Sequence, residues 1–153
     1  MRALAAILAL LPGCGAYYEI GKPTPLMFSD VRWADDAMDG AVGFWSHHGI
    51  AFNEGDPSGY RLMVTPLPPD RIGQCGNEAI EIAPSLAGKE QETRCVIAHE
   101  LGHLIGMNHV PQSESLMAPI VALPPDHAAC WWSERDQLEL EAALKRGISA
   151  CPG

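Results

Sequence analysis

The chain has 153 residues and a formal net charge of −9, from 19 acidic and 10 basic side chains. A chain of this length buries one hydrophobic core, so we expect a single domain. The acidic balance repels the phosphates of nucleic acids and of anionic lipids, and it predicts no nucleic-acid partner.

The first residues have the composition of an export signal. Arg2 precedes an apolar run, residues 3–11, that is too short to span a bilayer. The sequence Leu11-Pro12-Gly13-Cys14 resembles the lipobox of bacterial lipoproteins. The resemblance implies a signal peptide over residues 1–13 and a lipid on Cys14. It also implies an exported protein of the bacterial cell envelope that touches the membrane only through this anchor; a secreted protein is the alternative.

Glycine and proline interrupt the next stretch, so we expect a tether over residues 14–28 and a folded domain over 29–153. Apolar residues then recur with helical spacing over 29–48 and predict a first long helix. His47 and His48 lie at its C-terminal end, where the helix dipole favours an imidazolium. We interpret them as ordinary surface histidines and not as a second metal site.

Three short strands are expected after this helix. They cover residues 50–52, 61–65 and 79–83, and in the last of them Ile80 and Ile82 alternate with polar or small residues. Clusters of glycine and proline separate the three segments and predict turns.

The most informative motif lies at the centre of the chain. It reads His99-Glu100-Leu101-Gly102-His103, followed by Gly106 and His109. Residues four apart share one face of a helix, so His99 and His103 can bind one ion at about 2.0–2.1 Å. Glu100, next to the first ligand, is placed to act as a general base on a metal-bound water. Gly106 allows the chain to turn back, so that His109 becomes a third ligand. A fourth position left open for water is typical of catalytic zinc.

A second motif follows at Ser115-Leu116-Met117-Ala118-Pro119. Together the two motifs resemble the metzincin metallopeptidases, in which His-Glu-x-x-His-x-x-Gly-x-x-His precedes a Met-turn, and they are most similar to the matrixin family. The resemblance implies a zinc-dependent endopeptidase that acts on peptides or proteins, with Met117 as an apolar floor beneath the metal. Matrixins carry further metal-binding loops, but residues 50–92 contain no matching cluster, so we expect one catalytic zinc ion.

The resemblance also implies an α+β fold. It consists of a twisted, mostly parallel sheet with an antiparallel edge strand, two long helices before the Met-turn and one C-terminal helix. Substrate would pair with the edge strand, which we place near residues 77–82. The apolar loop 119–125 would line the pocket for the residue after the scissile bond. Ser133 and Asp136 predict the cap of the last helix, residues 134–146.

Two positions depart from the matrixin pattern. Val110 follows the third histidine where matrixins usually have serine, and no tyrosine follows Met117. His127 is the nearest polar candidate to assist the oxyanion, and we interpret it as a surface histidine. A rival interpretation of Pro12-Gly13-Cys14-Gly15 is the cysteine switch of matrixin precursors. It is disfavoured because only a signal-like segment precedes Cys14, whereas the switch normally follows a folded propeptide.

Four cysteines remain after Cys14, an even number that predicts two disulfides in an oxidising compartment. Four cysteines allow three pairings. From the implied positions of the edge strand and the zinc helix, we expect Cys75 to pair with Cys95, and Cys130 with Cys151.

We expect the endopeptidase to be a monomer. Two other classes of function stay open. One is a zinc-dependent amidase of the cell wall. The other is a zinc-bearing lipoprotein that acts by binding alone; Glu100 argues against it, because a binding module has no use for a base beside an open metal position.

Overall fold

A computed structural model describes residues 24–27, 29–76, 79–119 and 129–146. Five strands and three α-helices follow one another, with a short 3-10 helix before the second α-helix. Their bounds are β1 Thr24–Met27, α1 Arg32–His47, β2 Phe52–Glu54, β3 Tyr60–Val64, β4 Gly73–Cys75, β5 Ala79–Ile82, η1 Pro84–Leu86, α2 Glu90–Leu104 and α3 Glu134–Arg146.

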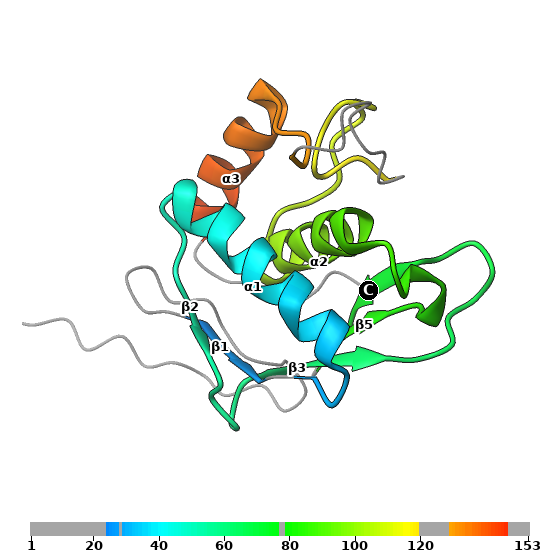
Figure 1. The fold of residues 1–153 in the computed structure, drawn as a ribbon. Helices are drawn as coiled ribbons and strands as arrows, with labels where there is room; N and C mark the ends of the chain where they lie inside the picture. Colours follow the sequence, from blue (N-terminus) through cyan, green and yellow to red (C-terminus); the bar gives the residue numbers. More distant parts are fainter. Residues whose placement is uncertain (1–23, 28, 77–78, 120–128, 147–153) are drawn as a thin grey trace, which may run out of the picture.

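The strands form one sheet in the order β2-β1-β3-β5-β4. Every neighbouring pair is parallel except β4 and β5, which run antiparallel at one edge. Helices α1 and α2 lie side by side on one face of the sheet, and α3 lies beyond them (Figure 1). This arrangement confirms the expected α+β fold class, with two helices before residue 117 and one after it.

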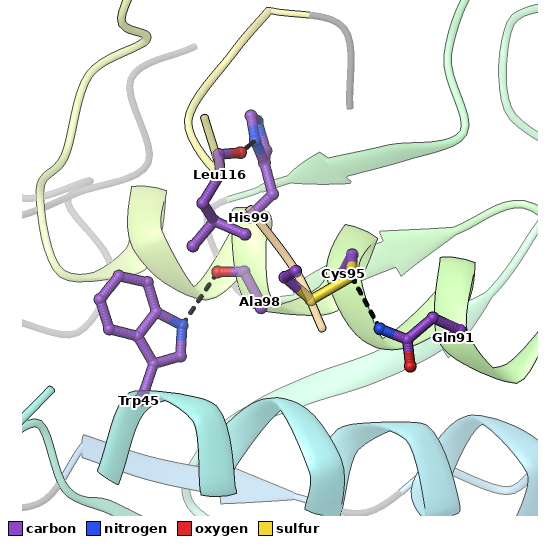
Figure 2. The surroundings of a disulfide bond; sticks show 7 residues. Trp45, Gln91, Cys95, Ala98, His99 and Leu116 are labelled. Carbon is purple, nitrogen blue, oxygen red and sulfur yellow. Dashed lines mark hydrogen bonds between the residues drawn. A yellow bond between two sulfur atoms is a disulfide. The ribbon is translucent and has the colours of Figure 1, made fainter. Parts of the chain in front are cut away.

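The core lies between the sheet and the two packed helices. Helix α1 buries Ala34, Met38 and Trp45 on one face, as its helical spacing predicts. Trp45 donates a hydrogen bond from Nε1 to the carbonyl of Ala98 at 2.9 Å, which joins α1 to the middle of α2 (Figure 2). Helix α2 is buried along most of its length, as expected for an element between a sheet and other helices.

The expected tether over residues 14–28 is wrong at its C-terminal end. Residues 24–27 form β1, which pairs with both β2 and β3, and Leu26 in this strand is fully buried. The two prolines suggested a loop, because proline is rare in internal strands; Pro25 pairs with β2 alone, and the pairing with β3 begins only at Leu26. Residues 14–23 and 28 lie outside the described residues.

The expected edge strand is also misplaced. Residues 79–82 form β5, an internal strand parallel to β3, while the antiparallel edge is β4, residues 73–75. The alternating isoleucines of β5 reflect burial inside the sheet and carry no information about which strand lies at the edge. Strand β4 has only three residues and no apolar alternation, so its sequence does not predict a strand.

Both expected disulfide pairings are wrong. Cys95 is bonded to Cys130, with an S–S distance of 2.12 Å and a Cα–Cα distance of 5.3 Å (Figure 2). Cys75 is also disulfide-bonded. Strand β4 with Cys75 does contact α2, but Cys130, in the segment before α3, is the cysteine that lies within bonding distance of Cys95. The observed bond instead joins α2 to the segment that leads into α3.

None of the helices that the structure describes combines the length and the apolar character that a membrane span requires.

Candidate metal centre

Three histidines meet at one point, as the motif predicted. His99 and His103 lie one turn apart on α2, and His109 comes from the loop that follows the helix. Their Nε2 atoms are 3.1 to 3.2 Å apart in all three pairs. Nitrogen atoms that bind one zinc ion tetrahedrally at about 2.0–2.1 Å are about 3.3 Å apart, so the observed triangle fits zinc.

The two helical histidines are held in the tautomer that a metal requires. Nδ1 of His99 donates to the carbonyl of Leu116 at 2.7 Å (Figure 2), and Nδ1 of His103 donates to the carbonyl of Met107 at 2.8 Å. A carbonyl can only accept, so the proton lies on Nδ1 and the lone pair lies on Nε2. Both Nε2 lone pairs therefore face the shared point.

Desolvation favours the neutral form of the imidazoles, most strongly for the buried His99. Desolvation, and then repulsion from His103, lower the pKa of His99 to about 3. Desolvation also lowers the pKa of His103 and of His109. Metal ligands must be deprotonated, so all three side chains are in the binding form at neutral pH.

The chain reverses direction immediately after α2. Gly106 has a φ of 95°, which L-residues with a side chain rarely adopt. The reversal is fixed by backbone bonds from Gly106 to His103 and from Met107 to Gly102, both at 2.9 Å. This turn confirms the role expected for Gly106, because it brings His109 back to the helical pair.

Met117 packs against α2 beside the histidines. A Cβ atom on Gly102 would lie 2.5 Å from its Sδ, so the helix accepts this methionine only because residue 102 is glycine. The amide of Val110 donates to the carbonyl of Met117 at 2.9 Å, which ties the Met117 segment to the residue after His109. Met117 itself is fully buried.

A buried carboxylate organises the same segment from α3. Asp136 accepts hydrogen bonds from the amides of Leu116 and Met117 at 3.0 Å and from Ser115 Oγ at 2.5 Å. It also accepts two bonds from Ser133, whose hydroxyl caps the helix as predicted. Because the carbonyl of Leu116 orients His99, Asp136 supports the metal centre indirectly.

Glu100 lies in the same buried space as the histidines, with 5% of its surface exposed. Burial raises the pKa of its carboxyl to about 8, although the positive charge of Arg71 opposes the shift. Strand β4 passes close above it, since a Cβ atom on Gly73 would lie 2.8 Å from Glu100 Oε1. A cation held by the three histidines would lower this pKa, and the carboxylate could then accept a proton from water and return it.

A cavity of about 800 Å³ opens over these groups. Its walls comprise residues 70–75 on one side and the three histidines with Glu100 on the other. Pro119 also lines it, as expected for the start of the loop 119–125, whereas residues 120–125 lie outside the described residues. The cavity therefore runs between the antiparallel edge of the sheet and the histidine cluster.

The sequence profile of the matrixin family of peptidases matches residues 16–140. The chain belongs to the matrixin family. No curated protein is significantly similar to it in sequence.

Several solved structures share the fold of this matrixin. Archaemetzincin from Methanopyrus kandleri superposes with a TM-score of 0.57 at 14% identity, over 84% of this chain and 99% of the other. A zinc-dependent peptidase from Methanocorpusculum labreanum gives 0.51 at 14% identity, over 76% and 99%. At this identity the comparison concerns the fold alone.

Several predicted positions in this matrixin have no part in the metal centre or cannot be placed. His47 is exposed at the end of α1, and His48 stacks on Trp132 with ring centroids 3.9 Å apart. Cys14, His127 and Cys151 lie outside the described residues.

Sequence reasoning missed three residues that shape the site: Asp136 as support for Met117, and Arg71 and Gly73 beside Glu100. Of these, only Asp136 carried a local signal, its position three residues after Ser133, and that signal indicated a helix cap.

Proposed function

We propose that this matrixin is an endopeptidase that hydrolyses peptide bonds with one zinc ion and Glu100 as general base. The observation that carries the proposal is the convergence of three neutral histidine nitrogens beside a buried carboxyl at the floor of an open cavity. Three protein ligands leave a fourth position for water, which distinguishes catalytic from structural zinc.

His99, His103 and His109 would hold the ion, which supplies a Lewis acid that lowers the pKa of water and polarises a carbonyl. Glu100 then takes a proton from the attacking water and returns it to the leaving amine. Its burial supports this role, because a buried carboxylate destabilises the fold and is kept at a site where proton transfer is needed.

A peptide chain is the substrate class that this cavity fits best. Among the described strands, β4 pairs only with β5, so the other edge of β4 is available for a further strand. An extended peptide added there would run along the cavity wall formed by residues 70–75 and pass over Glu100. Backbone hydrogen bonds to β4 would hold the peptide independently of its sequence.

The test compares wild type with Glu100→Ala on a denatured proteome and, in parallel, on peptidoglycan fragments. We expect wild type to produce new peptide termini and Glu100→Ala to be at least about 100-fold slower, because general base catalysis contributes roughly 10²–10⁴-fold. Zinc content should be equal in the two proteins. Cleavage of peptidoglycan alone would replace the endopeptidase with a cell-wall amidase, and no cleavage of either substrate would favour a binding protein.

We further propose that the protein is exported and anchored through a lipid on Cys14. The disulfide between Cys95 and Cys130 makes this proposal testable, because Cys75 is also disulfide-bonded. Within one chain its partner is therefore Cys14 or Cys151. A lipid attached to the sulfur of Cys14 excludes that atom from a disulfide, so lipidation requires Cys75 to pair with Cys151.

Non-reduced peptide mapping of the membrane fraction measures both features at once. We expect a peptide that joins Cys75 to Cys151 and an N-terminal peptide that carries the mass of a lipid on Cys14. A peptide that joins Cys14 to Cys75 would show that the anchor is absent and would favour a secreted protein.

A further inference from the structure

The third metal ligand is held less firmly by its own contacts than the other two. His99 and His103 are buried on a helix and have their Nδ1 atoms bound to carbonyls, whereas His109 is exposed and lies on a loop. Within the described part of the chain, no hydrogen bond holds Nδ1 of His109. Its position therefore depends on the backbone on both sides of it, which the bond from Val110 to Met117 holds after the histidine and residues 106–108 hold before it.

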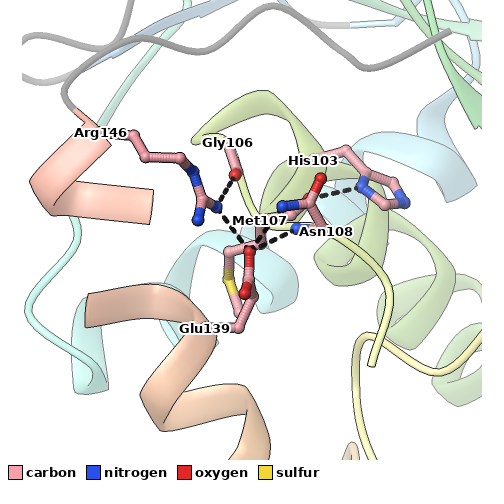
Figure 3. Close-up of polar contacts among 6 residues, drawn as sticks. All are labelled: His103, Gly106, Met107, Asn108, Glu139 and Arg146. Atoms are coloured by element: carbon pink, nitrogen blue, oxygen red, sulfur yellow. Dashed lines mark hydrogen bonds and ion pairs between the residues drawn. The ribbon is translucent and has the colours of Figure 1, made fainter. Parts of the chain in front are cut away.

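Two charged residues of α3 form hydrogen bonds with that backbone (Figure 3). The carboxylate of Glu139 accepts hydrogen bonds from the amide N–H and from Nδ2 of Asn108, both at 2.9 Å. Arg146 donates to the carbonyl of Gly106 at 2.7 Å and forms an ion pair with Glu139 at 2.5 Å. The contacts thus fall on the residue directly before His109 and on the glycine at which the chain reverses.

We propose that Glu139, held in place by its ion pair with Arg146, is a positioning residue that keeps His109 in the orientation that zinc binding requires. The physical reason is preorganisation. Asp136 already fixes helix α3 to the Met117 segment. A hydrogen bond from α3 to Asn108 therefore holds the loop in a fixed position relative to that segment. Without that bond, binding zinc requires the loop to be ordered at the cost of conformational entropy. This inference rests on the proposed zinc site.

The contacts are on the surface, so they contribute little to global stability. The side chains of Arg146 and Glu139 are 43% and 19% exposed, and ion pairs of this kind contribute weakly to folding. A role in positioning and a role in folding therefore predict different measurements. If the contacts position the loop, removing them lowers zinc affinity and leaves the metal-free fold intact. If they stabilise the fold, removing them lowers the stability of the metal-free protein.

The experiment measures zinc affinity by chelator competition, and the thermal midpoint of the metal-free protein, for Glu139→Ala, Glu139→Gln and Glu141→Ala. Glu141 is a matched control, since it lies on the same helix, is exposed and, among the described residues, bonds only to Gln137. We expect Glu139→Ala to bind zinc about 10- to 100-fold more weakly, the range typical of residues that orient metal ligands. Glu141→Ala should bind as wild type, and all four metal-free proteins should melt at similar temperatures.

Glu139→Gln separates positioning from charge. Its amide oxygen can still accept from the N–H of Asn108, so we expect it to recover most of the lost affinity. Equal losses in Glu139→Ala and Glu139→Gln would assign the effect to negative charge near the ion and overturn the proposal. So would wild-type affinity in Glu139→Ala, or a loss that follows a lower midpoint of the metal-free protein. Failure of wild type itself to bind zinc would instead refute the proposed function.

Discussion

Replacing His103 by alanine is expected to remove zinc from the protein and peptidase activity with it. His103 contributes one corner of the nitrogen triangle, since its Nε2 lies 3.1 Å from Nε2 of both His99 and His109. Apparent zinc-binding free energies of about 10–16 kcal/mol are shared among three or four protein ligands. Loss of one ligand should therefore cost about 3–4 kcal/mol, which corresponds to a roughly 100- to 1,000-fold weaker affinity.

The measurement is zinc content after dialysis against a weak chelator, together with the rate of peptide hydrolysis. His47→Ala is the matched control, because it removes an exposed histidine that is not in the cluster. It should keep about one zinc ion and full activity. Glu100→Ala should keep the zinc and lose the activity, which separates the ligand from the base. Stoichiometric zinc in His103→Ala would show that the three histidines are not the metal site.

Replacing Asp136 by alanine is expected to destabilise the metal-free protein by about 3–5 kcal/mol. The carboxylate is fully buried and accepts five hydrogen bonds, two of them from the backbone of the Met117 segment. Removing it leaves buried donors without acceptors, and each such group costs about 1–3 kcal/mol, partly offset by relaxation and water. Zinc affinity should also fall, because the carbonyl of Leu116 loses its fixed position and no longer orients His99.

Urea denaturation of the metal-free protein, with its disulfides intact, measures the free energy of unfolding. Glu134→Ala is the control, since Glu134 is an exposed acidic residue in the same first turn of α3. It should change the free energy of unfolding by less than about 1 kcal/mol. If Asp136→Ala and Glu134→Ala unfold at the same urea concentration, Asp136 has no role in fixing the Met117 segment.

Local sequence patterns predicted the parts of this protein that local geometry controls. The four-residue spacing of His99 and His103 places both on one face of α2, and Gly106 permits the turn that returns His109. The bounds of α3 and its Ser133 cap were also predicted, because a cap depends on residues three apart. These features follow from helix periodicity and backbone sterics, which need no knowledge of distant residues.

Contacts between distant segments were decided only by the tertiary structure. A three-residue strand such as β4 is stabilised by its pairing with β5, so nothing in its own sequence indicates an edge. The bond between Cys95 and Cys130 spans 35 residues and depends on where α3 begins relative to α2. The contact of Glu139 with Asn108 likewise joins residues 31 apart. Such pairings are set by the packing of whole elements, and an exposed charged residue on a helix carries no sign of the loop it contacts.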